Sequence, residues 1–422
     1  MRRIVILGTG TGGTPVANRL RRALAPDDAS IVCVDRDDDH LYQPGLLYVP
    51  FGRRTLPSLT RSRRAQLHHG IDFVEGEVDA VELDARRVRL ADGTALDYDY
   101  LVVAAGARLA PEETEGLTGP GWMERVFTFY SPAGAAALAD AFARFSGGRL
   151  VVAVLDTLIK CPVAPLEFTF LAEDALAKRG VRDRVEIAYV TPLEGAFTRP
   201  IASQRLAWLL ADRGVELVSS FATASVDGAA GRLTSYDGRG VDFDLAVVIP
   251  AHNGPAFVTR SPGLGDALGY VPVDERTLQL PGHPEVFALG DATGLSTSKA
   301  GSVAHFESEV LVENLVATFD GRPPLARFDG HTNCFLELGR GEALLIDFNR
   351  DVEPVPGHYP GPVGLPLLAP SRIDHLGKLA FESLYWHALL PGHSIPGVAS
   401  PMPRRGKRLS MLRHPAYAGE PR

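Results

Sequence analysis

The chain has 422 residues, of which 45% are hydrophobic and 22% are charged, and its formal net charge is −8. A hydrophobic chain of this length can bury large cores, which predicts two or three globular domains rather than one. Because the charge balance is acidic, the chain has no general positive field that would hold nucleic-acid phosphates, and we expect no nucleic-acid partner.

The first predicted elements are a buried strand over residues 4–8, a helix over 14–25 and a second strand over 30–35. Asp35 ends the second strand, where an acid can accept hydrogen bonds from an adenosine ribose. A G-x-G-x-x-G motif opens the helix, so backbone N–H groups can receive a pyrophosphate. The motif alone fits FAD and NAD equally, because both carry the same pyrophosphate and ribose. Its glycines are Gly8, Gly10, Gly12 and Gly13.

The apolar run at the N-terminus is too short for a secretory signal, because it meets glycine at Gly8. No stretch approaches the roughly 18–20 apolar residues that span a bilayer. We therefore expect a cytoplasmic protein for which peripheral contact with the cytoplasmic membrane face stays open. Three cysteines are too few and too far apart for a disulfide framework or a metal site. Cys33, inside the second strand, is expected to be an ordinary buried residue.

Two later strands end in residues that resemble FAD-binding segments. The strand over 100–105 runs into Ala105 and Gly106, and the strand over 286–289 is followed by Gly290 and Asp291. Both segments resemble those of two-domain flavoproteins, in which the second holds its aspartate near the ribityl chain. The resemblance implies FAD as the cofactor. A helix over about 301–318 then predicts that the FAD-binding domain is split in sequence, over 1–108 and 270–330.

A second α/β unit is predicted over residues 109–269, with strands at 150–155 and 185–190 and a helix at 167–179. Its first turn contains Lys160, Cys161 and Pro162 in place of glycines. Bulky side chains and a proline obstruct the approach of a pyrophosphate to the backbone, so we expect this unit to have lost nicotinamide binding. The predicted fold class is α/β, with two Rossmann-like dinucleotide-binding domains and a C-terminal interface region.

Residues 331–422 form the third predicted region. It has an alternating pattern over 333–348, a Pro/Gly-rich link over 354–370 and an aromatic, helix-like segment over 376–390. The tail over 404–422 carries six basic residues and one acid. This mixture suits a helix in the membrane interface beside anionic lipid, and the alternative is a helix packed on the protein body.

Two segments carry a more specific resemblance. Residues 159–167, which contain Cys161 and Glu167, and the tripeptide at 333–335, which contains Cys334, resemble the two active-site cysteine segments of sulfide:quinone oxidoreductases and of related flavocytochrome sulfide dehydrogenases. The similarity covers nearly the whole chain. It implies that Cys161 takes on sulfane sulfur, that Cys334 lies next to the flavin and that Glu167 is a general acid/base. The implied substrate is sulfide or a related small sulfur species.

The same resemblance implies a route for the electrons to a membrane quinone. Lys299 and Gly301 open the predicted helix over 301–318, where a cation would stabilise the anionic reduced flavin. In the family a lysine at this position serves both flavin and quinone. Phe381 matches a phenylalanine that sandwiches the quinone ring, which suits a flat aromatic side chain. The sequence leaves open whether the chain forms a homo-oligomer.

The chain departs from some family members at two places. A third cysteine is replaced within 128–130, and histidines near the sulfide channel are missing from 131–134 and 195–198. Three alternative functions therefore stay open. They are a type II NADH:quinone oxidoreductase, the flavin subunit of a flavocytochrome sulfide dehydrogenase, and a flavin-bound sulfur sensor that does not turn over.

Overall fold

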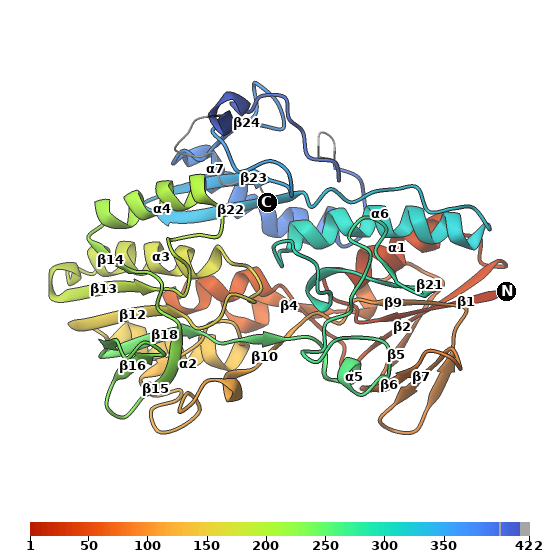
Figure 1. The fold of residues 1–422 in the computed structure, drawn as a ribbon, viewed down its shortest axis with the longest axis horizontal. Coiled ribbons are helices and arrows are strands. Elements are labelled where there is room, and N and C mark those ends of the chain that lie inside the picture. Colours follow the sequence, from red (N-terminus) through yellow and green to blue (C-terminus); the bar gives the residue numbers. More distant parts are fainter. Residues whose placement is uncertain (396–397, 414–422) are drawn as a thin grey trace.

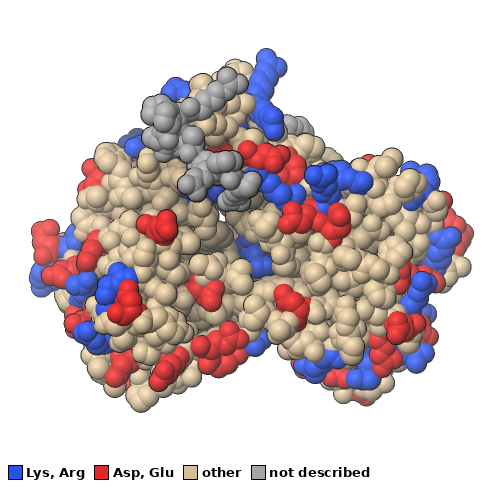
Figure 2. All heavy atoms as spheres, viewed as in Figure 1, with Lys and Arg blue, Asp and Glu red and all other residues tan. Residues whose placement is uncertain are grey.

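The computed structural model describes residues 1–395 and 398–413, and Figure 1 shows two α/β lobes side by side with a third layer across one edge. The part of the basic tail at 414–422 lies outside the described residues. Acidic and basic side chains alternate over both lobes on the face drawn in Figure 2. Within the described ranges, no helix has the length and apolar character needed to cross a membrane.

The first lobe is built on a sheet whose strands are parallel except at one edge. Its central strands are fully buried apolar runs, as expected when both faces of a parallel sheet are covered. Cys33 is 0% exposed inside one of them, so the prediction of an ordinary buried cysteine is confirmed. In spatial order the strands are β20 (Gln279–Leu280), β21 (His283–Ala288), β9 (Tyr100–Val103), β1 (Arg2–Leu7), β2 (Ala29–Asp35) and β5 (Ile71–Glu75).

Helices cover one face of this sheet and a small antiparallel sheet covers the other. Helix α1 (Gly13–Ala23) and helix α6 (Gly301–Phe319) pack against each other, and they cover β1 and β21 respectively. Because β21 pairs with β9, a segment from late in the chain completes a sheet that the N-terminus begins. The opposite face carries β6 (Val78–Glu82), β7 (Arg87–Leu90), β8 (Ala95–Asp97) and the short helix α5 (Ala256–Thr259).

The second lobe repeats this plan with a five-stranded parallel sheet. Helices pack on one face and a three-stranded antiparallel sheet packs on the other. The strands in spatial order are β11 (Val126–Phe127), β18 (Leu245–Ile249), β12 (Gly148–Val154), β13 (Val185–Val190) and β14 (Val215–Val218). The covering elements are α2 (Pro132–Arg144), α3 (Ala164–Lys178), α4 (Pro200–Asp212), β15 (Thr223–Asp227), β16 (Arg232–Ser235) and β17 (Gly240–Asp242).

The third layer is a four-stranded sheet with one helix packed on it. Its strands in order are β22 (Thr332–Gly339), β23 (Glu342–Phe348), β25 (Leu365–Leu367) and β24 (Gly357–Tyr359). Helix α7 (Arg372–Leu384) begins where the Ser371 hydroxyl accepts a hydrogen bond from the Ile373 N–H, and it continues as one π-helical turn, Tyr385–Leu389. A Cβ on Gly377 would lie 2.8 Å from the Phe335 ring, so this glycine lets α7 approach β22 closely.

Short pairings connect these layers. Strands β3 (Asp39–Leu41) and β4 (Thr60–Ser62) form one antiparallel pair, and β10 (Arg108–Leu109) and β19 (His252–Asn253) form another. A 3-10 helix over Gln43–Phe51 packs against α2 and α3. One residue of the basic tail is not free for lipid contact, because the Lys407 ammonium is buried in an ion pair with Asp347.

Candidate active site

The glycine loop between β1 and α1 is tightly packed on one side and open on the other. Gly8 has φ +94°, and a Cβ on it would lie 2.6 Å from the backbone of Ala104 and Ala105. A Cβ on Gly13 would lie 1.8 Å from the Gly8 carbonyl oxygen, and one on Gly12 would lie 3.3 Å from the Leu289 side chain. At Gly10, no described atom lies within 4 Å of the Cβ position. The open side is where a pyrophosphate can reach the backbone.

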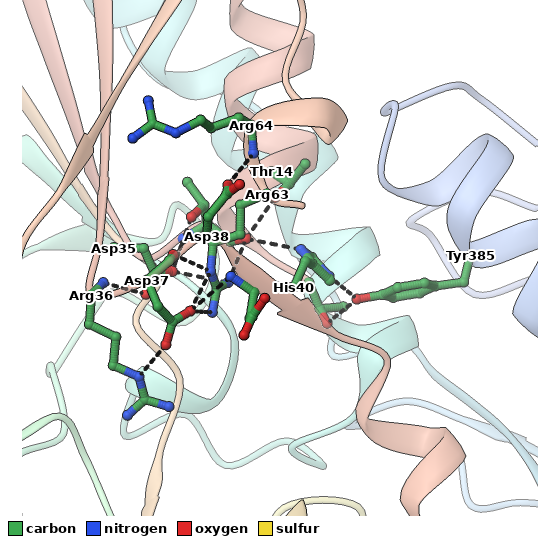
Figure 3. A network of polar contacts seen from close by, with 12 residues as sticks. Thr14, Asp35, Arg36, Asp37, Asp38, His40, Arg63, Arg64 and Tyr385 are labelled. Carbon is green, nitrogen blue, oxygen red and sulfur yellow. Dashed lines mark hydrogen bonds and ion pairs between the residues drawn. The ribbon is translucent and has the colours of Figure 1, made fainter. Parts of the chain in front are cut away.

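Asp35 lies at the end of β2, beside the glycine loop, as Figure 3 shows. Its Oδ2 accepts hydrogen bonds from the Thr9 N–H at 2.8 Å and the Thr9 hydroxyl at 3.0 Å. The Arg63 guanidinium forms an ion pair with the same oxygen at 3.1 Å and donates to the Thr9 carbonyl. Arg63, which the sequence did not single out, therefore holds the acid and the loop in one arrangement.

The C-terminal segment reaches the glycine loop through a tyrosine (Figure 3). His40 Nδ1 lies 3.1 Å from the Thr9 carbonyl oxygen, so this nitrogen carries the proton and Nε2 accepts from the Tyr385 hydroxyl at 2.7 Å. The Thr11 hydroxyl then donates to the Tyr385 oxygen at 2.9 Å. Burial, together with the nearby Arg63 charge, lowers the pKa of His40 to about 3, so the ring stays neutral in this chain of bonds.

The second set of expected cofactor residues lies at the same edge of the sheet. Gly106 and Gly290 both have positive φ, +71° and +67°, and α6 begins at Gly301. The Lys299 ammonium donates to the Asp291 carbonyl at 3.0 Å and to the Thr293 carbonyl at 2.7 Å. Lys299 is thus held by the loop after β21, on the same side of the sheet as Asp291.

Cys161 lies in the loop between β12 and α3, the counterpart of the glycine loop in the second lobe. Its φ is +48°, which is strained for a residue with a side chain. Two contacts hold it there. Its N–H donates to the Lys299 carbonyl at 2.6 Å, and the Tyr130 hydroxyl donates to its carbonyl at 3.0 Å. The contact with Lys299 joins the second lobe's loop to the start of α6 in the first lobe.

Cys334 lies on β22 and also faces the first turn of α6. Burial raises the pKa of its thiol to about 12, while Lys378 and the neighbouring Ser302 act in the opposite direction. Burial, Glu167 and Cys334 likewise raise the pKa of Cys161 to about 12. Both cysteines are free thiols, and Glu167 and Lys378 act on the pKa of each of them. Two residues distant in sequence are therefore both placed beside residues 299–302.

Glu167, in the first turn of α3, is buried and 1% exposed. Its Oε1 accepts from the Lys378 ammonium at 2.8 Å and from the Glu337 N–H at 2.9 Å. Although burial works against the charge, Glu167 and the nearby Tyr48 raise the pKa of Lys378 well above its usual value. The predicted acid/base residue is thus one half of a buried ion pair, and the Lys378 ammonium of that pair also donates to the Phe335 carbonyl, next to Cys334, at 3.2 Å.

Phe381 is half-buried on α7 and packs against the large core that also holds Cys161 and Cys334. The opposite side of α7 exposes Ile373, Leu376 and Leu379 by 56%, 63% and 44%. Beside them is a surface hollow of about 660 Å³. Its wall includes Arg53, Arg54, Arg61, Leu379, Glu382 and Trp386.

These residues fit FAD. The glycine loop leaves backbone N–H groups open to a pyrophosphate, Asp35 ends β2 beside that loop, where it would face the adenosine ribose, and the segments at 105–106 and 290–291 lie at the same edge of the sheet. The chain has two dinucleotide-binding folds. The first carries the glycine loop between β1 and α1, and the second carries the Cys161 thiol at the matching position, which defines the class as an FAD-dependent oxidoreductase. The chain belongs to the pyridine nucleotide-disulphide oxidoreductase family, whose family model matches residues 2–307. The predicted fold class, cofactor and enzyme class are confirmed.

The resemblance to sulfide:quinone oxidoreductases is also confirmed. The mitochondrial sulfide:quinone oxidoreductase of Mus musculus is 26% identical over 83% of this chain and 79% of its own length. That of Dictyostelium discoideum is 27% identical over 92% of this chain and 86% of its own length. The solved structure of the Aquifex aeolicus sulfide:quinone oxidoreductase superposes with a TM-score of 0.79 at 19% identity, over 93% of this chain and 92% of the other.

Proposed function

We propose that the protein oxidises sulfide, or a closely related small sulfur species, and passes the electrons through FAD to a membrane quinone. The observation that carries the proposal is that Cys161 and Cys334 both contact the segment 299–302 at the start of α6. The Cys161 N–H donates to the Lys299 carbonyl, and the Ser302 hydroxyl lies beside the Cys334 thiol, where it acts to lower the pKa of that thiol. The relatives in mouse and Dictyostelium support it, because their names state sulfide and quinone as reactants. We assign the FAD-binding domain to 1–108 and 270–330, the second fold to 109–269 and the interface region to 331–422.

The sulfur chemistry requires both thiols. In the oxidised state a disulfide joins Cys161 and Cys334; HS⁻ attacks the Cys161 sulfur, the S–S bond breaks, and Cys161 becomes a persulfide while Cys334 leaves as a thiolate. The persulfide sulfur then bonds to the Cys334 sulfur, which forms a trisulfide and releases one proton and two electrons. When bound, FAD supplies the two-electron acceptor that passes this pair to the quinone. We assign the proton to Glu167, which lies in the first turn of α3, directly after the Cys161 loop.

The overall balance is one HS⁻, one quinone and one proton consumed for each sulfane sulfur and each quinol formed. Phe381, on α7, and Lys299, just before α6, are the residues we assign to the quinone. The exposed apolar side chains of α7 lie next to the hollow that contains Arg54 and Arg61, which suits peripheral contact with a membrane that carries the quinone.

The experiment that tests the proposal is anaerobic titration of the flavin-loaded protein with sulfide. We expect loss of the flavin's visible absorbance on addition of sulfide and its return on addition of a short-chain ubiquinone. Bleaching without recovery on quinone addition would identify a sulfur sensor that does not turn over. If sulfide leaves the spectrum unchanged, the proposed activity is rejected.

A further inference from the structure

A second buried carboxylate, Glu337, lies behind the Glu167–Lys378 ion pair and has no part in the sulfur chemistry above. Its side chain is 0% exposed on β22, between α3, α7 and the 3-10 helix over Gln43–Phe51. Two contacts satisfy it. His375 Nδ1 lies 2.9 Å from Oε1 and 3.1 Å from Oε2, and the Tyr48 hydroxyl donates to Oε1 at 3.3 Å.

Helix geometry explains how the two carboxylates are connected. His375 and Lys378 are three residues apart on α7, so they occupy one face of the helix. Each of them meets one buried carboxylate, Lys378 on Glu167 and His375 on Glu337. The backbone N–H of Glu337, rather than its carboxylate, donates to Glu167 at 2.9 Å, so the two acids are held beside each other by β22 and α7 without a direct bond between their carboxyl groups. Tyr48, from the 3-10 helix over Gln43–Phe51, covers the remaining side of the Glu337 carboxylate.

The chain of groups has an inner and an outer end. The Lys378 ammonium donates to the carbonyl of Phe335, the neighbour of Cys334, at 3.2 Å, and Glu167 lies in the first turn of the helix that follows the Cys161 loop, so the inner end lies toward the two thiols. The His375 side chain is 21% exposed, so the outer end reaches solvent. Burial and the negative charge of Glu167 raise the pKa of Glu337, which brings this carboxyl closer to the range in which it can both gain and lose a proton.

We propose that Glu337 and His375 form the outer half of a proton path that links solvent to Glu167 and Lys378 at the reaction centre. This role of the path rests on the proposed function. Each quinol needs two protons: the persulfide releases one, and solvent must supply the other for each HS⁻ oxidised. Glu337 receives that proton from His375 and passes it inward. His375 and Glu337 touch no reactant and act only through Glu167 and Lys378.

A different reading of the same contacts is purely structural, with the Glu337–His375 pair fixing α7 on the sheet. Buried ion pairs are weak evidence for stability, because desolvation offsets much of the attraction between the charges. The two interpretations differ when His375 or Glu337 is replaced and α7 stays in place. Proton transfer slows if they form a path, and it is unchanged if they only fix the helix. The test must therefore follow protons rather than activity alone.

The test uses ferricyanide, which removes electrons from reduced protein without carrying protons. Flavin-loaded protein is photoreduced anaerobically, freed of the reductant and mixed with ferricyanide in weak buffer that contains a pH-indicator dye. Two ferricyanide ions take two electrons from each reduced flavin, and one proton is released. In the wild type, and in His393→Asn as an exposed-histidine control, we expect proton release to keep pace with flavin reoxidation.

In Glu337→Gln and His375→Asn we expect proton release to lag flavin reoxidation by about tenfold or more. Imidazole in the medium should restore the rate in His375→Asn but not in Glu337→Gln. His375→Asn lies at the partly exposed end of the path, so it tests the path even if Glu337→Gln fails to fold. Proton release that stays in step with the flavin in His375→Asn would overturn the proposal. Neither sulfide nor quinone is used, so this result is separate from the fate of the proposed function.

Discussion

The two lobes use the same fold to present opposite chemistry at the same position. In the first lobe, the five residues 8–12 join the central strand to its helix, and they are mostly glycines that leave the backbone open. In the second lobe, the nine residues 155–163 make the same connection, and they bring Cys161 forward at positive φ. A parallel sheet thus fixes where a ligand acts, while the length and side chains of one loop decide whether it acts on a phosphate or on sulfur.

The contrast extends to the buried acids. In the second lobe, Glu167 is paired with the Lys378 ammonium. In the first lobe, Glu307 accepts a hydrogen bond from the Gly290 N–H at 2.6 Å, and burial raises its pKa to about 7. Of the two buried acids, Glu307 has no cation in an ion pair with its carboxylate among the described contacts, and it gains a proton as the pH falls through about 7.

The strongest test of the comparison removes either sulfur. We expect Cys161→Ser and Cys334→Ser each to slow flavin reduction by sulfide by about 10³-fold or more, because serine cannot form a persulfide or pass on its electrons. FAD content should stay at the wild-type level, since neither residue belongs to the glycine loop. Stopped-flow absorbance measures both quantities, with Cys33→Ala as the control that leaves the rate unchanged. A wild-type rate in either serine variant would remove that cysteine from the mechanism.

A nicotinamide cofactor tests whether the second loop has lost nucleotide binding. We expect NADH to reduce the flavin at least about 100-fold more slowly than sulfide does, because the loop with Lys160 and Pro162 is tied to Lys299 and leaves no open backbone for a pyrophosphate. Anaerobic stopped-flow mixing with each donor in turn measures the ratio. Rapid reduction by NADH would favour a type II NADH:quinone oxidoreductase instead.

The glycine loop can be tested at a position where only the ligand is affected. A Cβ on Gly10 meets no described atom within 4 Å, so Gly10→Ala should fold normally and bind FAD about 10- to 100-fold more weakly. Gly13→Ala is the matched variant, because its Cβ meets the Gly8 carbonyl oxygen and should destabilise the fold itself. Flavin fluorescence titration and thermal melting separate the two outcomes. Equal FAD affinity in Gly10→Ala would contradict the assignment of the open side.

The smallest expected effect concerns Glu307. Its folded-state pKa of about 7 lies above the ordinary value of 4.5, so the unfolded chain loses this proton first and stability falls as pH rises from about 4.5 to 7. Glu307→Gln removes this loss. The variant should match the wild type at pH near 4.5 and exceed it by roughly 1–3 kcal/mol above pH 7. Denaturant melts across this range measure it, with exposed Glu313→Gln on the same helix as the control.

Local patterns predicted most of the fold. The strand over 185–190 coincides with β13, and the helix expected from residue 167 begins at Ala164, because Pro165 is tolerated in the first turn, where its missing N–H has no partner to lose. The helix expected over 376–390 begins earlier, at Arg372, because Ser371 caps it. Glycine spacing predicted the loop between β1 and α1, and the first cysteine segment lies in the matching loop of the second lobe, whereas Cys334 lies within strand β22.

Groups contributed by several elements could not be predicted in this way. Arg63, His40 and Tyr385 come together around the glycine loop from segments with no shared motif, so only the three-dimensional arrangement reveals them. Glu337 gave one usable signal. A charged residue inside the apolar hairpin pattern over 333–348 is expensive to bury without partners, and this indicates a polar network even when its members are unknown.

The contact between Tyr385 and the glycine loop limits how freely this enzyme's parts can be exchanged. Thr11 and His40 complete a hydrogen-bond chain that ends on the tyrosine, so helix α7 and the π-helical turn that carries Tyr385 are not an interchangeable module. A chimera that grafts this tail onto another flavoprotein would have to transplant those two side chains with it. Without them, the hydroxyl of the grafted tyrosine would have no hydrogen-bond partner beside the glycine loop. We expect FAD affinity to fall, so that the specificity for an electron acceptor could not be measured.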